Sequence, residues 1–327
     1  MSTILLSLFL SIMPVDLTQR LPVSQDYGRA EQIAKVFHKP MIVLFTGSDW
    51  NPESQALVDK ILYDPAFYDV LRKEFVFAQV DFPEIERHHP DVIVRNNLLK
   101  EAHHVESFPT LVLIDEEQHE ISRTGLVSTD PEQFAAHLKS LRGRYVRISE
   151  GLEMPHIDNE NLKFYYTDAR ELGAPHLLQK VLERGLAIKD DPYFHIERYN
   201  ELCTAGNSDT EEAKNLRETA LKMDPNNVYG AHYRLAILDF QATADDTTLT
   251  PEDAVAPLKN YIAKYGASDR DHLWRLHFML AHYLFSRDCH DDALEHARTC
   301  YQEAPSFMKK EAFRTVECMR EQIKDKK

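Results

Sequence analysis

The chain has 327 residues, of which 43% are hydrophobic and 28% are charged. This length favours about two domains, and the composition provides enough apolar side chains for a packed core in each. The formal net charge of -15 repels a phosphate backbone, and no dense Lys/Arg cluster offsets it. The composition therefore excludes a disordered chain and argues against nucleic acid as a partner.

An apolar run of ten residues, Ile4 to Met13, lies near the start of the sequence. Such a run is too short to span a bilayer as a helix but matches the core of a signal peptide. No Lys or Arg precedes it and no small-x-small cleavage site follows it, so a first buried strand or helix is the alternative. We expect residues 1–25 to be an apolar leader and a candidate signal peptide. We expect no integral membrane span in the chain. We favour export to a compartment such as the periplasm over a cytoplasmic location.

Helical and strand patterns then follow one another as far as Leu141, in the order αβαβαββα when the two consecutive helices after the first strand are counted as one helical segment. This order is typical of an α/β thioredoxin fold, in which helices cover both faces of a mixed central sheet. The predicted helices are 26–38, 51–62, 64–73, 98–104 and 132–141, and the predicted strands are 41–45, 75–81, 111–114 and 120–123.

We expect the stretch from Lys39 to Ser54, KPMIVLFTGSDWNPES, to organise this domain. A buried strand leads to a tight turn, and Pro52 favours the start of a helix that Asn51 or Asp49 caps. Trp50 in the turn has two interpretations. It is either an exposed aromatic contact for a bound peptide or a residue retained by packing against the turn.

This stretch, the following VDFP, and SFPTLVLID with its hairpin and RTG resemble the thioredoxin-like family of secreted disulfide-isomerase relatives. The resemblance covers about Asp26 to Leu141 and implies a thioredoxin-like domain over 26–145. It also implies a cis-proline beside the turn and a backbone that holds extended polypeptide by strand-like hydrogen bonds. The residues expected to contact that peptide are Trp50, Pro52, Phe108, Pro109 and Thr110.

The turn of that family carries Cys-x-x-Cys, whose two thiol positions are Asn51 and Ser54 here. Neither an amide nor a hydroxyl can form a mixed disulfide. No His or Asp near Ser54 in the sequence supports a role as nucleophile. The buried carboxylate that thioredoxins use as a proton relay corresponds by register to Phe45. We therefore expect a degenerate turn with no catalytic residue and no cofactor.

Paired histidines at 88–89 and 103–104, and the cluster 289–292, raise the question of a metal site. Adjacent side chains point in different directions, and the spacing HExxH is absent. We expect the paired histidines to be exposed to solvent, the cluster to be a polar turn, and no metal to be bound.

Beyond a predicted linker at 146–158, the pattern is helical throughout 159–327. Pro192, Pro225, Gly266 and Pro305 punctuate it at intervals of 33, 41 and 39 residues. With the segment ETALKMDPNN, this all-α region resembles a tetratricopeptide-type (TPR-like) helical-repeat domain, whose units have about 34 residues. The resemblance implies a concave face that docks a partner protein. The residues expected on that face are His232, Tyr233, Trp274 and His277.

All four cysteines, Cys203, Cys289, Cys300 and Cys318, lie in this half. None is spaced as a redox pair or a metal knuckle, so each is expected to be a small buried apolar residue. If the protein is exported, a bridge between Cys300 and Cys318 on neighbouring helices is an alternative.

The leading hypothesis is a redox-inactive, chaperone-like or scaffolding module that binds extended polypeptide and docks a partner through its helical domain. The alternative is a thiol-disulfide isomerase or oxidoreductase that uses a cysteine outside the turn. A third hypothesis is a structural fusion in which neither domain binds anything.

Overall fold

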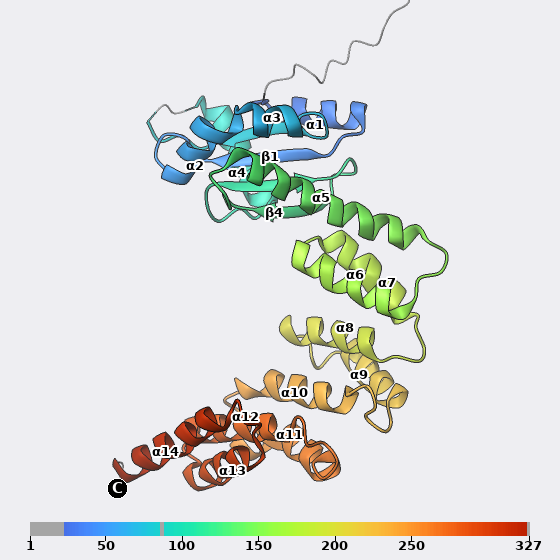
Figure 1. The fold of residues 1–327 in the computed structure, drawn as a ribbon, viewed down its shortest axis with the longest axis vertical. Coiled ribbons are helices and arrows are strands. Elements are labelled where there is room, and N and C mark those ends of the chain that lie inside the picture. Colours follow the sequence, from blue (N-terminus) through green and yellow to red (C-terminus); the bar gives the residue numbers. More distant parts are fainter. Residues whose placement is uncertain (1–22, 86–87, 326–327) are drawn as a thin grey trace, which may run out of the picture. The chain divides into compact units, whose positions relative to one another are not determined.

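The computed structural model describes residues 23–85 and 88–325. Most of the predicted leader lies outside these residues. The chain divides into two compact units, one ending at Glu183 and one beginning at Arg184. Figure 1 shows the sheet with its helices in the first unit and the helices of the second. No helix within the described ranges is both long and apolar enough to cross a membrane.

The first unit is built on a four-stranded mixed sheet in the order β2-β1-β3-β4. The central strand β1 is parallel to β2 and antiparallel to β3, and β3 forms a hairpin with β4. All six residues of β1 are buried, which explains their continuous apolar pattern. The strands are β1 (Met41–Thr46), β2 (Val76–Asp81), β3 (Thr110–Ile114) and β4 (Glu120–Thr124).

Helices cover both faces of this sheet. On one face, Ala30 and Ala34 of α1 pack in one cluster with Val43 and Phe45 of β1. On the other, the Phe67 ring of α3 contacts rings of β2 and α5. The predicted α/β thioredoxin fold is thus confirmed. The elements are α1 (Tyr27–Phe37), α2 (Pro52–Leu57), the π-helix η2 (Val58–Leu62), α3 (Pro65–Leu71), α4 (Pro90–Ala102), α5 (Pro131–Glu153), α6 (Asn159–Leu172) and α7 (Pro175–Leu186).

Two of these helices are longer than the sequence predicted. Helix α4 begins at Pro90 rather than at residue 98, because His89 caps it by accepting a hydrogen bond from the backbone of Asp91. Helix α5 continues to Glu153, so the segment 146–158 predicted as a linker is helical over its first half. The apolar face of α5 explains this, since Tyr145, Ile148 and Leu152 continue the helical spacing of its buried residues.

Helix α6, which we assigned to the helical domain, contacts the first unit. Ser122 of β4 donates a hydrogen bond of 2.7 Å to the carbonyl oxygen of Leu172. Asp168 of α6, only 6% exposed, pairs with Arg144 and Arg147 of α5. These contacts explain why the first compact unit extends to Glu183.

The second unit is all helical, as predicted. Successive helices pack as α8 on α9, α10 on α11 and α12 on α13, and α14 packs on α13. Small buried residues such as Ala213, Ala254 and Ala293 allow close approach between paired helices. The helices are α8 (Tyr193–Thr204), α9 (Glu211–Met223), α10 (Ala231–Ala244), α11 (Pro251–Tyr265), α12 (Leu273–Ser286), α13 (His290–Glu303) and α14 (Lys309–Asp325).

Candidate functional site

The turn between β1 and α2 keeps the shape that the sequence predicted. The backbone nitrogen of Asn51 donates to the carbonyl oxygen of Gly47 at 2.9 Å. The side-chain oxygen of Asn51 accepts a hydrogen bond of 2.8 Å from the backbone of Ser54, so Asn51 is the N-cap of α2. Asp49 instead accepts the backbone N–H groups of Glu84 and Ile85, at 2.9 and 2.6 Å. The turn is thereby tied to the loop after β2.

Ser54 lies at the second degenerate position and is fully buried. Its hydroxyl oxygen accepts a hydrogen bond of 3.1 Å from the backbone nitrogen of Gly47. This bond closes the turn from inside. A hydroxyl without access to solvent cannot meet a substrate, so Ser54 has a structural role.

Trp50 is packed against the turn and also exposed. Its indole nitrogen Nε1 donates a hydrogen bond of 2.8 Å to the carbonyl oxygen of Phe82, and its ring meets Phe108 edge to face at 5.8 Å. A side chain at Gly47 would come within 2.5 Å of this ring, which explains the glycine. Yet 41% of Trp50 stays exposed. An aromatic side chain held in place while open to solvent is suited to anchor a ligand.

The Phe108–Pro109 bond is cis, as the resemblance implied. The Phe108 ring also lies 5.1 Å from the ring of Phe82, so Trp50, Phe82 and Phe108 form one aromatic cluster beside Pro109. Thr110 begins β3 and donates its hydroxyl to the carbonyl oxygen of Ser107 at 2.8 Å. Pro52 is exposed at the first position of α2.

The buried position beneath the turn is apolar. Phe45 has no exposed surface, and its ring lies 5.6 Å from that of His103. The prediction that His103 is exposed was wrong: it is half-buried between Phe45 and Tyr27, and burial lowers its pKa. The His103 ring is buried because it packs against the apolar side chain of Phe45 in β1. Tyr27 is partly buried as well, and this burial raises its pKa to about 12.

A network of polar side chains joins the ends of β1 and β2. The sequence patterns did not predict this network. Asp81 accepts hydrogen bonds from the hydroxyl of Thr46 at 2.6 Å and from the backbone of Ser48 at 3.0 Å. Gln79 donates to the Thr46 hydroxyl at 3.0 Å, and Asn96 of α4 donates to the Asp81 carbonyl at 2.9 Å. The sequence does contain a sign of this network, because Thr46 ends an otherwise apolar strand and Gln79 and Asp81 are polar residues of the next strand. This network fixes the strand ends that carry Trp50 and Phe82.

Within the residues that the structure describes, no three His, Cys, Asp or Glu side chains converge as metal ligands. All four cysteines are free thiols, so the conditional bridge between Cys300 and Cys318 is not formed. Cys300 is buried beside Trp274, whereas Cys318 is exposed. Burial raises the pKa of Cys300 to about 11 and also raises that of Cys203.

The four predicted partner-binding residues of the helical unit fall into two groups. Tyr233 lines a cleft of about 530 Å³ between the loops around Asn227 and Asp269, and His232 lines an adjoining cleft of about 360 Å³. Trp274 and His277 are each only 8% exposed and belong to the helix-packing core. Burial therefore does not favour a contact role for these two residues.

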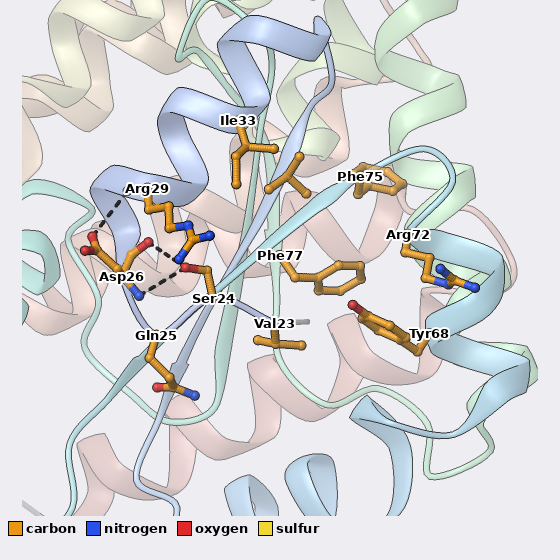
Figure 2. A pocket seen from close by; sticks show the side chains of 11 residues that line it. Val23, Ser24, Gln25, Asp26, Arg29, Ile33, Tyr68, Arg72, Phe75 and Phe77 are labelled. Carbon is orange, nitrogen blue, oxygen red and sulfur yellow. Dashed lines mark hydrogen bonds between the residues drawn. The ribbon is translucent and has the colours of Figure 1, made fainter. Parts of the chain in front are cut away.

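Another cavity, of about 350 Å³, lies at the outer edge of β2 (Figure 2). Ser24 forms a parallel bridge with Ala78 there, and Phe75 and Phe77 give the cavity an aromatic lining. This cavity adjoins the start of β2, whereas the turn lies beside Asp81 at its end. It is therefore separate from the aromatic cluster.

The sheet, the cis-proline and the capped turn define a thioredoxin-like protein without a cysteine pair at its turn. Residues 27–142 match the model of the thioredoxin-like domain. The chain is 30% identical over 309 residues to the thioredoxin-related protein DsbJ of Chlamydia pneumoniae, across 91% of this chain and 87% of that protein. It belongs to the same family of thioredoxin-related proteins. This similarity includes the helical region.

A second relative is the disulfide bond reductase DsbH of Chlamydia pneumoniae. It is 30% identical over 116 residues, which are 36% of this chain and 70% of that protein. A solved structure named DsbH oxidoreductase matches with 27% identity and a TM-score of 0.35, over 40% of this chain and 91% of that chain.

Proposed function

We propose that this protein is a redox-inactive thioredoxin-like module that binds extended polypeptide beside Trp50 and Pro109. The observation that carries the proposal is the state of the two degenerate positions. Asn51 caps α2 and Ser54 is buried under the turn, so both side chains stabilise the turn and neither is a thiol. The aromatic cluster beside them remains partly exposed.

The helical unit is proposed to be a degenerate tetratricopeptide-type domain that docks a partner protein, in a chaperone-like or scaffolding role. The pairwise packing of α8 to α13 and the small buried residues between paired helices support this. The clefts lined by His232 and Tyr233 are the docking surfaces that we propose within this unit. Export to an extracytoplasmic compartment is part of the proposal and rests on the apolar run from Ile4 to Met13.

The alternative is a thiol-disulfide oxidoreductase, which the similarity to the disulfide bond reductase DsbH favours. Its thiol would have to come from Cys203, Cys289, Cys300 or Cys318. A raised pKa reduces the thiolate fraction of Cys203 and Cys300 near neutral pH, and the thiolate is the attacking species.

Insulin reduction by the full-length protein in the presence of dithiothreitol tests the proposal. We expect the rate to equal the rate without protein, and we expect alkylation of all four cysteines to change nothing. The double variant Asn51→Cys/Ser54→Cys is the matched comparison, because it restores a thiol pair on the same scaffold. Turnover by the wild type that alkylation abolishes would establish the oxidoreductase alternative.

Binding of an extended, unfolded polypeptide is tested separately by fluorescence anisotropy with a labelled peptide. We expect Trp50→Ala to weaken binding, with Trp50→Phe in between. If the wild type binds no such peptide, or if Trp50→Ala binds it as well as the wild type, the thioredoxin-like unit has no client site at the turn. That result would favour the third hypothesis for this unit, in which the domain has a structural role and binds nothing.

A further inference from the structure

Three loops of the first unit meet around Trp50. The loop 47–54 contacts the loop 81–85 through the bonds from Trp50 to Phe82 and from Asp49 to the backbone of Glu84. The loop 104–110 contacts both of these loops, because the Phe108 ring packs against the rings of Trp50 and Phe82. Residues that are far apart in the chain therefore form one continuous surface.

The described parts of these three loops that lie next to Trp50 carry acidic side chains and no Lys or Arg. Among residues 47–54, 81–85 and 104–110 there is no Lys or Arg. Two of the acidic side chains are held by hydrogen bonds within the surface, namely Asp49 and Asp81. Three others are exposed, and they are Glu53, Glu84 and Glu106.

Exposed apolar and aromatic side chains lie in the same loops as these carboxylates. Trp50 is 41% exposed and Ile85 is 78% exposed, and both lie in these loops. Glu53 in the first turn of α2 stabilises the helix dipole, but Glu84 and Glu106 lie outside helices.

One aromatic ring of this surface, that of Phe108, is already in contact with a cation. The Lys100 ammonium of α4 lies 5.5 Å from the centroid of the Phe108 ring, at the distance of a cation–π contact. Trp is the strongest partner for such contacts among the aromatic side chains. The exposed ring of Trp50, with carboxylates nearby, offers the same attraction to a cation from another molecule.

We propose that the polypeptide held at this surface is basic and apolar: an extended segment in which an aliphatic or aromatic side chain is flanked by Lys or Arg. Its apolar residue packs on Trp50 and Ile85, and its cations face Glu53, Glu84 and Glu106. Acidic segments are rejected, since like charges across an interface are repulsive. The inference rests on the proposed polypeptide-binding function and specifies its client.

The test compares three labelled peptides of equal length that share one apolar centre and differ in its flanks, which are Lys, Ser or Glu. Anisotropy titrations use the full-length protein at low salt and at 0.5 M NaCl. We expect the Lys peptide to bind at least about tenfold more tightly than the Glu peptide at low salt, with a smaller ratio at high salt because ions screen exposed charges.

Two variants with the same change in charge separate the local effect from the effect of net charge. The site variant is Glu53→Gln/Glu84→Gln/Glu106→Gln, and the control is Glu132→Gln/Glu150→Gln/Glu153→Gln on the exposed surface of α5. We expect the site variant to lose most of the preference for the Lys peptide and the α5 variant to retain it. Circular dichroism checks that both are folded.

The outcomes distinguish this inference from the function on which it rests. If all three peptides bind equally, or if both variants lose the preference to the same extent, the inference is wrong. The proposed function survives that result as long as Trp50→Ala weakens every peptide. If no peptide binds, or if Trp50→Ala has no effect, the proposed function fails as well.

Discussion

The indole nitrogen of Trp50 donates a hydrogen bond of 2.8 Å to the carbonyl oxygen of Phe82, which lies 32 residues further along the chain. This bond holds the ring against Phe108 while 41% of the side chain faces solvent. Binding therefore does not require the ring to become ordered, which lowers the entropic cost of holding a ligand. The surface beside the turn is preorganised.

Replacing Trp50 by Phe should lower the free energy of unfolding of the first unit by about 1 kcal/mol, because one hydrogen bond and part of the ring contact are lost. Urea unfolding followed by circular dichroism measures this change. The variant Tyr63→Phe is the control, since it removes a polar atom from a side chain that is 56% exposed. Equal stability of Trp50→Phe and the wild type would show that the bond contributes nothing.

Ser54→Ala should destabilise the first unit by about 1 to 3 kcal/mol, because it leaves the Gly47 N–H without its acceptor. The exposed helical residue Ser140 is the matched control, and Ser140→Ala should change stability by less than about 0.5 kcal/mol. Both values come from urea midpoints. If both substitutions have the same small effect, the buried hydroxyl does not close the turn.

Asp168→Ala should destabilise the packing of α6 on α5 by about 2 to 3 kcal/mol, because a carboxylate that is 6% exposed pairs with two arginines. The value lies at the low end for a buried pair, since Arg147 is 52% exposed. Limited proteolysis between α5 and α6 should also accelerate. A double-mutant cycle with Arg147→Ala measures the coupling, and additive effects would contradict a direct interaction.

Acid should destabilise the helical unit through His277. The Nδ1 atoms of His277 and His296 lie 2.9 Å apart. Burial, and to a smaller extent the neighbouring His296, lowers the pKa of His277 to about 4. The unfolded chain binds a proton near pH 6.5 while the folded chain resists it, so stability is full above pH 6.5 and falls towards pH 4. The charged groups that face His296 are Lys259 and Glu252 of α11 and Glu295 and Asp292 of α13.

The loss should be on the order of 2 kcal/mol between pH 7 and pH 4. Urea unfolding at a series of pH values measures it, and His277→Phe should flatten the dependence in this range. The control substitution His156→Phe, at an exposed position, should leave the pH dependence unchanged. An identical pH profile for His277→Phe and the wild type would contradict this assignment.

If the protein is exported, the mature chain should begin at or before Val23. Ser24 pairs with β2 through bonds of 3.1 and 2.8 Å, and Asp26 caps α1, so removal of these residues would expose the edge of the sheet. N-terminal sequencing of the protein purified from its host measures this. A mature chain that begins later than Val23 would contradict the prediction.

Local sequence patterns determined the order of helices and strands along the chain, a capped helix start at Pro52 and the absence of a thiol pair, because periodicity, capping chemistry and residue identity act over a few neighbouring positions. The structure decided between Asn51 and Asp49 as the cap. The tertiary structure decided which side chains are buried or brought together. Ser54 lies under the turn, His103 packs against Phe45, and Trp274 and His277 enter the helical core, each because of contacts from residues that lie apart in the chain. The acidic surface around Trp50 likewise exists only because three loops converge, and no single stretch of sequence encodes that proximity.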